Sequence, residues 1–405
     1  MASAESLTKQ SIIENHEQFF ALVLAPLTFA ALAILYLLLN IHWFGTEISA
    51  DSYYDLNTYY RYIRLIRDDQ LPYIDFKIEY PVFFGLVLVV LSAIPFQSFV
   101  EFSYLYWGFC YSIYCFTVLV LYNTGTLLGV ERLVEKLFLF VVFSPTYISL
   151  LLIRYDILPL LAVATAFNFF VRYQNSGLER HLLLSLLFCS IGLNIKWFPI
   201  FLLPFVFVVD FNRRKVISRL VFAILPSILL NGPFMVLGLE TWVQSYLVHF
   251  NRIPNTDSFY FPVSLVTGSV FQTLTTLLFI LFVLLSGLLV IVSYKRQFSK
   301  PRELLWAYIV VTVLFLLLNK VFSPQFLLWV FPLLIFLPWQ RFFLLIPLID
   351  VINIFTILFL TNYQVLFPLT ILRHVLLFLF LVLLVRSFKN NLKEVQFPDN
   401  NSLRQ

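Results

Sequence analysis

Acidic side chains are concentrated in one segment of the chain. The sequence has 22 Asp and Glu residues among 405, and seven of them lie between residues 45 and 81, in a stretch that is also rich in tyrosine. Carboxylates held among hydroxyl groups suit proton transfer to or from a substrate. The segment therefore indicates an enzyme site rather than an anchor or a scaffold. Its main candidate acids are Asp51, Asp55, Asp68, Asp69, Asp75 and Glu79.

Asp55 is the first candidate for a catalytic base. In the stretch DLNTYYRYIRL it precedes Tyr59 by four residues, so the two side chains share a face if the stretch is helical. A carboxylate in that position could remove a proton from an attacking hydroxyl group. The alternative is that Asp55 is a helix N-cap, a role that Asp51 could also fill. We expect Asp55 to act as base and Tyr59 to contact the substrate.

Asp75 and Glu79 lie in the stretch LPYIDFKIEYP, between Pro72 and Pro81. A proline disfavours helical backbone in the residue before it, so we expect an extended segment here. The two carboxylates could orient an acceptor sugar. They could equally tie the segment down through nearby cations, and both alternatives stay open. Those cations are Arg61, Arg64 and Lys77.

Charged residues also interrupt apolar stretches further along the chain. Ionisable side chains in such places are costly and tend to mark sites or pathways, although Arg154 and Asp156 could simply pair with each other. Lys196, in GLNIKWFP, has no acidic neighbour in sequence. Its ammonium could hold a phosphate or could extend to the membrane surface. Lys320 presents the same choice, with Gln325 as a further hydrogen-bonding group.

The composition indicates that most of the chain lies in a lipid bilayer. Hydrophobic residues make up 60% of the chain, charged residues make up 12%, and the mean hydropathy is +0.89. These values are far from those of a soluble domain, and apolar runs of about 20 residues, enough to cross a bilayer, recur along the chain. The formal charge of +5 comes from short loops and the tail, as cytoplasmic loops of membrane proteins require. The chain is a multi-span membrane protein, and we expect no nucleic-acid partner.

Signatures of cofactor and metal sites are missing from the sequence. Cys110, Cys115 and Cys189 have neither disulfide nor metal-ligand spacing. There is no glycine-rich phosphate loop and no HExxH motif. We therefore expect no metal, no cofactor and no ATP-driven pumping by this chain. His249 stands alone in a segment rich in aromatic residues and indicates nothing by itself.

The charge pattern predicts one all-α domain over 1–405, with about 12 crossings and both ends, 1–18 and 389–405, in the cytoplasm. Two short apolar pieces, 182–195 and 197–209, are expected to be separate short helices on either side of Lys196. Segment 81–98 is expected not to cross fully. The external loop at 45–80 should bear juxtamembrane helices and share one face with Arg154, Lys196 and Lys320. The other predicted spans are 19–42, 102–122, 136–153, 157–173, 216–238, 268–293, 303–319, 325–338, 342–360 and 369–388.

The order of the motifs resembles that of a known family. The motifs are Asp55–Leu56–Asn57–Thr58–Tyr59, Leu71–Pro72–Tyr73–Ile74–Asp75–Phe76, Glu79–Tyr80–Pro81, Arg154–Tyr155–Asp156, Lys196–Trp197–Phe198–Pro199 and Lys320–Val321–Phe322–Ser323–Pro324–Gln325. Together they resemble the GT-C membrane glycosyltransferases, most closely the polyprenyl-phosphate-mannose-dependent group, glycosyltransferase family 87. The sequence departs from the family pattern at Val82, where a second proline is frequent, and in the stretch NRIPNTDS at 251–258, which matches loosely.

The resemblance implies an inverting transferase that needs no cofactor. It would move a hexose, by default mannose, from a polyprenyl-phosphate donor to a glycolipid or glycan acceptor at the external face. Asp55 would be the base, and Lys196 or Lys320 would lie near the donor phosphate. The expected location is a bacterial inner membrane, with the endoplasmic-reticulum membrane as the open alternative, in contact with membrane lipids. The candidate substrate-binding residues are Tyr59, Asp75, Glu79, Arg154, Asp156, Lys196, Lys320 and Gln325.

Two other classes of function stay open. A transporter or lipid flippase could use a broken helix with Lys196 at the break, although the sequence shows no inverted repeat. A non-catalytic subunit of an envelope-polysaccharide assembly system is the third possibility. The number of acids in one loop argues against that last alternative.

Overall fold

The computed structural model describes residues 54–396 except residues 143, 151, 152, 269, 297, 299 and 361. Several predictions lie outside the described residues: the N-terminal segment 1–18, the span at 19–42, Asp51 and the end of the tail. Within the described part the chain forms helices and one isolated bridge between Pro72 and Phe76, and no strand. The predicted all-α class is confirmed.

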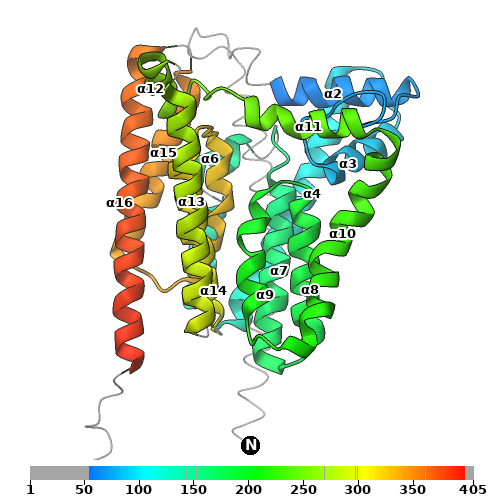
Figure 1. Cartoon of the computed structure of the whole chain (residues 1–405). Helices are drawn as coiled ribbons and strands as arrows, with labels where there is room; N and C mark the ends of the chain where they lie inside the picture. Colours follow the sequence, from blue (N-terminus) through cyan, green and yellow to red (C-terminus); the bar gives the residue numbers. More distant parts are fainter. Residues whose placement is uncertain are drawn as a thin grey trace, which may run out of the picture.

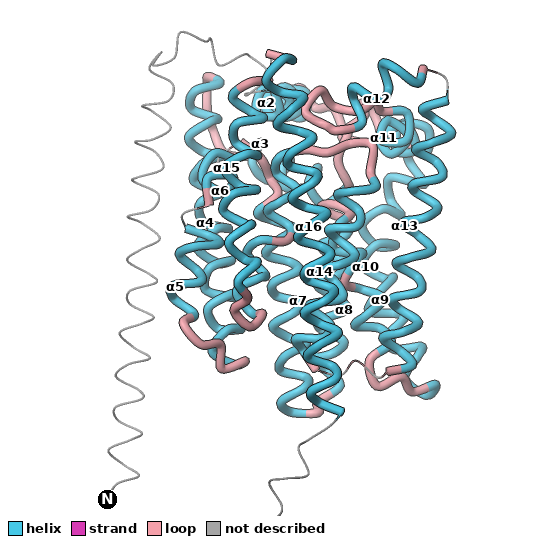
Figure 2. The backbone as a smooth tube through the Cα atoms, turned by 90° about the vertical axis from the view of Figure 1, so that its left-hand side faces the viewer, coloured by secondary structure: helices cyan, strands magenta, loops and turns pink. Residues whose placement is uncertain are grey.

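In the part of the chain that the structure describes, six helices are long and apolar enough to cross a membrane. Figures 1 and 2 show them running side by side along the long dimension of the bundle. Because a helix rises about 1.5 Å per residue, about 20 residues span the hydrocarbon core of a bilayer. The prediction of a multi-span membrane protein is therefore confirmed. The six are α4 (Phe99–Leu127), α7 (Ile157–Ser176), α10 (Val216–Leu237), α13 (Val270–Lys295), α14 (Pro301–Leu318) and α16 (Tyr363–Gln396).

Two predicted spans are divided into short pieces. The first, at 136–153, is interrupted by the π-helix η2 and by Ser144. The second, at 325–338, consists of two 3₁₀ helices, each with a proline in its first turn, where the missing N–H is tolerated. The pieces are α5 (Leu133–Leu137), η2 (Phe138–Val142) and α6 (Pro145–Leu150), then η5 (Pro324–Trp329) and η6 (Phe331–Phe336). They are followed by η7 (Arg341–Leu344) and α15 (Leu345–Leu358).

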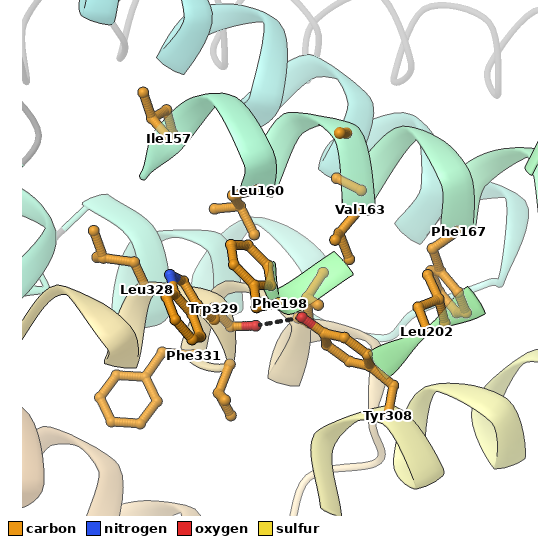
Figure 3. Close-up of a cluster of buried hydrophobic side chains, with 14 of the residues drawn as sticks. Ile157, Leu160, Val163, Phe167, Phe198, Leu202, Tyr308, Leu328, Trp329 and Phe331 are labelled. Carbon is orange, nitrogen blue, oxygen red and sulfur yellow. Dashed lines mark hydrogen bonds between the residues drawn. The ribbon is translucent and has the colours of Figure 1, made fainter. Parts of the chain in front are cut away.

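Dense packing holds the 3₁₀ pair in the middle of the bundle. Every residue of η5 and η6 is buried. Trp329 stacks on Phe198 with ring centroids 4.4 Å apart, and the Tyr308 hydroxyl on α14 donates a hydrogen bond of 3.2 Å to the Trp329 carbonyl (Figure 3). A carbonyl that a regular α-helix would use internally thus finds its partner on a neighbouring helix.

Two short helices lie across one end of the long ones. Figure 1 shows α2 (Tyr54–Arg67) and α11 (Leu239–Asn251) running crosswise at the top of the bundle. Beside them α3 (Val82–Ser92) has 11 residues, or roughly 16 Å of helix. It is too short to cross a bilayer, as expected for segment 81–98. A further short helix, α12 (Tyr260–Thr267), precedes α13.

The chain breaks at Lys196 as expected. Helix α8 (Glu179–Leu193) ends before it, and η3 (Phe198–Phe201) and α9 (Leu203–Val208) follow. Both later pieces start with a proline in their first turn, which lacks the N–H needed to continue a preceding helix. The turn between α8 and η3, which holds Lys196 and Trp197, lies beside α11, because Trp197 packs on Tyr246 and His249 of that helix.

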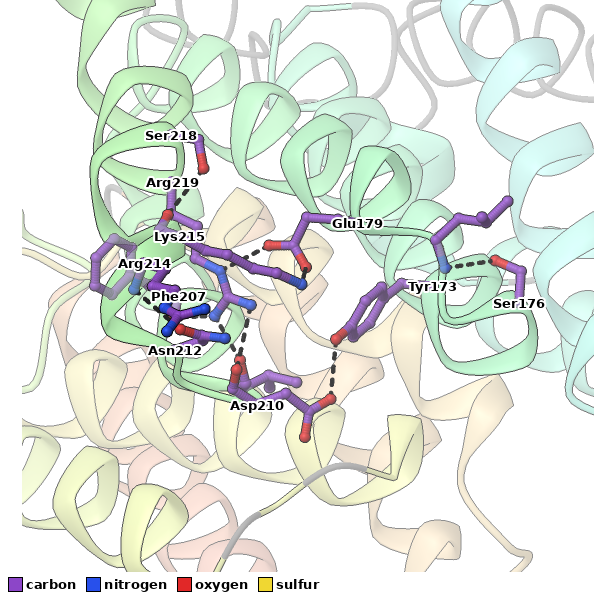
Figure 4. Close-up of polar contacts among 12 residues, drawn as sticks. Tyr173, Ser176, Glu179, Phe207, Asp210, Asn212, Arg214, Lys215, Ser218 and Arg219 are labelled. Atoms are coloured by element: carbon purple, nitrogen blue, oxygen red, sulfur yellow. Dashed lines mark hydrogen bonds and ion pairs between the residues drawn. The ribbon is translucent and has the colours of Figure 1, made fainter.

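The opposite end of the bundle carries basic loops, and an ion-pair cluster fastens one of them. Glu179 accepts from Lys215 Nζ at 2.8 Å and from Arg219 Nε at 3.0 Å, and Tyr173 donates to Asp210 at 3.0 Å (Figure 4). Figure 1 shows that the loops after α9 and α13 and the end of α16 all lie at this end, far from α2. The shared side predicted for these basic segments, around η4 (Arg213–Lys215), is therefore observed.

Candidate active site

A cavity of about 620 Å³ lies at the end of the bundle where α2 and α11 run crosswise. Its wall is built from α2, the 79–81 segment, the 154–155 turn, the turn before η3, α11, the first half of α13, the end of α14 and the segment from 319 to η5. Segments far apart in sequence thus contribute side chains to one space. The predicted site residues that line it are Asp55, Glu79, Arg154, Lys196, Lys320 and Gln325.

Asp55 lies in the first turn of α2 and forms an ion pair with Arg154. A carboxylate is favoured in this place because the first turn of a helix carries unpaired N–H groups and a partial positive charge. Arg154 comes from the irregular turn before α7, and its side chain is mostly buried. Burial lowers the pKa of Arg154, yet a guanidinium remains charged in proteins. The pair holds one carboxylate oxygen of Asp55 in a fixed direction at the cavity wall.

Asp156 pairs with Lys196 rather than with Arg154, so the alternative of an Arg154–Asp156 ion pair is wrong. Lys196 Nζ donates to both carboxylate oxygens, at 2.7 and 2.8 Å, and Trp329 Nε1 donates to one of them at 2.8 Å. Asp156 is fully buried and does not line the cavity. Burial lowers the pKa of Lys196, and the charge and hydrogen bonds of Asp156 oppose that effect. The ammonium is therefore bonded to a buried carboxylate of the bundle.

Tyr59 lies behind the cavity wall and supports it. Its ring is fully buried and packs edge-on against Tyr80 at 5.5 Å, Phe84 at 5.0 Å and Tyr155 at 6.2 Å between centroids. Tyr80 and Tyr155 line the cavity themselves. Edge-to-face contacts of this kind fix ring orientation beyond simple burial. Tyr59 is thus placed to position other residues, and it does not reach the cavity that Asp55 lines.

Asp75 lies outside the cavity lining, in a tight turn beneath α11. Its carboxylate accepts a hydrogen bond of 2.7 Å from the Leu71 N–H, and the residue is exposed. Thr241 of α11 donates to the Ile74 carbonyl at 3.1 Å, which fastens the turn to the helix above it. Within the described residues, Asp75 forms no salt bridge with Arg61, Arg64 or Lys77, nor does Glu79. Asp75 shapes the turn through a main-chain N–H instead.

Lys320 and Arg252 approach the cavity from two segments that are bonded to each other. Asn255 Nδ2 donates to the Phe322 carbonyl at 3.2 Å, and Ser258 Oγ donates to the Lys320 carbonyl at 3.0 Å. Both cations line the cavity, and burial lowers the pKa of Lys320. The two hydrogen bonds fix the 252–258 segment against the 319–323 turn, so two positive side chains share one stretch of the wall.

The structure also places residues in the wall that sequence reasoning did not select. Tyr80, Tyr155, Trp197 and Arg252 are cavity residues, and so is His249. The first three are aromatic neighbours of predicted charged residues, which is a signal that could have found them. Arg252 and His249 come from α11 and the stretch after it, and only their long-range placement brings them here. In the described ranges, no group of three or more His, Cys, Asp or Glu residues is arranged to hold a metal ion.

Comparisons with known proteins find no relative of this chain. No protein-family model, no curated protein and no solved structure matches it. The fold and the site describe a class of protein without such a match. The chain is a multi-span helical membrane protein with a cavity lined by charged and aromatic side chains at one end of its bundle.

Proposed function

We propose that the chain is an inverting glycosyltransferase that takes a hexose, by default mannose, from a polyprenyl-phosphate donor. The observation that carries the proposal is the placement of Asp55 in the wall of a cavity that also holds four cationic side chains. A base and a group of cations in one cavity suit displacement of a phosphate from a sugar. In this proposal the bundle is GT-C-like with about 12 crossings.

Asp55 acts as the general base of the proposed reaction. It takes the proton of the acceptor hydroxyl as the hydroxyl oxygen bonds to the anomeric carbon of the donor sugar. The bond between that carbon and the phosphate oxygen breaks, its electron pair leaves with the phosphate, and the configuration at the carbon inverts. Arg154 keeps Asp55 oriented through their ion pair. Polyprenyl phosphate is a stable anion, so the reaction needs no separate acid.

Arg252 and Lys320 are assigned to the leaving phosphate. Both line the cavity, and hydrogen bonds between their segments hold them on one stretch of its wall, so an anion bound there would meet two positive charges. Cations aimed at developing charge stabilise the transition state in a water-poor site. Phe279, Phe315 and Leu318 form an apolar part of the same wall, which suits the first isoprene units of the donor.

The proposed orientation places the cavity outside the cytoplasm. The basic loops lie at the other end of the bundle (Figure 1), and such loops favour the cytoplasmic side. A lipid-linked donor and a glycolipid or glycan acceptor would meet the cavity at the external face, and a bacterial inner membrane is the proposed location.

The direct test is transfer of labelled mannose from polyprenyl-phosphate-mannose to a crude lipid extract by the purified protein. We expect a labelled product whose formation requires active protein. A protein that binds this donor but forms no sugar product with any extract would contradict the proposal.

A transporter or lipid flippase is the second candidate, favoured by one observation. Helix α8 ends at Leu193 and η3 begins at Phe198, so a charged residue does lie at a helix break, as in many transporters. Movement of a lipid-linked sugar across proteoliposome membranes without any sugar transfer would favour this candidate.

A further inference from the structure

Trp197 is an exposed aromatic ring inside the cavity. It lies in the turn between α8 and η3, is 40% exposed and lines the same space as Glu79 and His249. None of the steps assigned above uses this ring. An exposed tryptophan ring in a charged cavity is suited to binding a ligand that has one apolar face and polar groups at its edge.

Helix α11 supports the ring from one side. Tyr246 stacks on Trp197 with centroids 6.2 Å apart and 26° between the planes, and His249 meets it edge-on at 5.7 Å. Trp242 packs on Tyr246 in turn, at 4.9 Å. The tryptophan is therefore one member of a small aromatic wall, with its orientation set by neighbours on α11.

A hydrogen-bond network fixes this aromatic wall to two further helices. Asn231 Oδ1 on α10 accepts from Trp242 Nε1 at 3.0 Å and from the Tyr246 hydroxyl at 2.9 Å. Asn231 Nδ2 donates to Asn194 Oδ1 at 2.6 Å, directly after α8. Buried polar networks in which every member is bonded hold side chains in one arrangement. Trp197 therefore packs against side chains that are themselves held in place by hydrogen bonds, which suits a ring that binds a ligand.

Polar groups accompany the ring in the cavity. His249 Nε2 donates to the Glu79 main-chain carbonyl at 2.8 Å, and burial lowers the pKa of His249, which keeps the ring neutral at neutral pH. With Nε2–H as the donor, Nδ1 is an acceptor. Glu79 lines the same wall, and its side chain carries a carboxylate that can accept hydrogen bonds from a ligand. An aromatic face with nearby acceptors presents both of the surfaces that a sugar ring needs.

We infer that the wall of Trp197, Glu79 and His249 is a hexose-binding subsite, and that it takes the terminal sugar of the acceptor. A pyranose ring has one face of C–H bonds, which carry partial positive charge and are attracted to the negative face of an aromatic ring. Its hydroxyl groups lie around the rim and would donate to the Glu79 carboxylate and His249. The inference rests on the proposed function in one respect: it names the acceptor as a glycan end rather than a lipid headgroup or a polypeptide.

The test measures binding of simple octyl hexosides to the protein in lipid nanodiscs, free of sugar detergents. The probes are octyl α-mannoside and octyl β-glucoside, with octanol as the tail-only control. We expect saturable binding of at least one hexoside and none of octanol. Trp197→Leu should weaken binding by roughly tenfold, the range of a lost aromatic contact, and Trp197→Phe should restore most of it.

Trp339 provides the matched control. It is 46% exposed and packs on Phe140 and Phe343, but it does not line the cavity. Trp339→Leu should leave hexoside binding unchanged. Equal binding by wild type and Trp197→Leu would overturn the inference, and so would a wild type that binds neither hexoside.

Failure of the inference and failure of the proposed function are distinguishable. Asp55→Asn should lower transfer by about 10²–10⁴-fold and keep hexoside binding, because the amide has nearly the shape of the carboxylate and lacks only the ability to take the proton. Hexoside binding that depends on Trp197, in a protein with no transfer activity, would keep the subsite and refute the transferase. In an active transferase, Trp197→Leu should raise the KM for acceptor more than it lowers kcat; an unchanged acceptor KM would refute the subsite.

Discussion

The carboxylate of Asp55 is ion-paired with the guanidinium of Arg154, and both groups line one cavity. Asp55 starts a helix that lies across the end of the bundle, whereas Arg154 belongs to the turn before a long apolar helix. The pair therefore joins a crosswise helix to the central bundle. It also places a negatively charged oxygen where a substrate hydroxyl could reach it.

This pair gives a prediction about stability. Removing one partner of a mostly buried ion pair leaves the other charge without compensation, which destabilises by roughly 3–5 kcal/mol. We expect Arg154→Gln to lower the free energy of unfolding on that scale. The double variant with Asp55→Asn should recover part of the loss, and a double-mutant cycle of unfolding measurements gives the coupling. Strictly additive effects would contradict the pairing.

Arg252 and Lys320 are predicted to determine affinity for the donor phosphate. Each removed cation weakens attraction to an anion, so Arg252→Gln and Lys320→Gln should each reduce binding of polyprenyl phosphate by roughly tenfold, the scale of one charge-assisted hydrogen bond. Binding of labelled polyprenyl phosphate measures this. Lys300→Gln, at the other end of the bundle, is the matched control and should have no effect. If the two cavity variants bind like wild type, the phosphate lies elsewhere.

His249 predicts a pH dependence of stability. Burial lowers its pKa below the ordinary 6.5, and the charges of Arg252 and Lys196 add to this, while Glu79 opposes it. As pH falls below about 6.5, the unfolded state takes up a proton that the folded state still excludes, so folding stability falls. Thermal unfolding at pH 7.5 and pH 5.5 should therefore show a smaller loss for His249→Gln than for wild type. A larger loss in the variant would reverse the sign and refute the assignment.

Gly238 is predicted to be needed for close packing of α11 on the 71–76 turn. A Cβ at this position would lie 2.6 Å from the Tyr73 carbonyl oxygen and 2.8 Å from Ile74 Cα. Both are backbone atoms that cannot rotate away, so Gly238→Ala should destabilise by about 1–3 kcal/mol. Gly287→Ala is the control, because a Cβ there meets no atom within 4 Å. Similar melting temperatures for the two variants would contradict the packing.

Local features of the fold could be predicted from the sequence. The helix near Asp55 follows from its four-residue spacing to Tyr59. The break at Lys196 and the short helix after Pro81 follow from apolar runs that are too short, or wrongly placed, to cross with the basic loops on one side. Charge in short loops also predicted which segments share an end of the bundle. Such signals act over a few residues and do not depend on the rest of the chain.

Long-range partners could not be predicted in the same way. Arg154 and Asp156 are two residues apart, yet they pair with Asp55 and Lys196 and not with each other. This choice of partners depends on how distant segments meet in space. An apolar stretch such as 324–336 also reads as one span, because hydropathy does not distinguish a lipid-facing helix from buried 3₁₀ turns. The placement of α11 over the cavity, which brings His249 and Arg252 to the wall, has no local signal at all.

The measurement that tests the central claim most directly is sugar transfer by Asp55→Asn beside Asp68→Asn. Both variants remove one carboxylate from the same segment with little change in shape, but Asp68 is exposed and lies outside the cavity. The labelled donor is polyprenyl-phosphate-mannose, and folding is checked by thermal unfolding of each variant. Loss of a general base lowers kcat by about 10²–10⁴-fold, so we predict that loss for Asp55→Asn and near-wild-type transfer for Asp68→Asn. Full transfer by a folded Asp55→Asn protein would contradict the account.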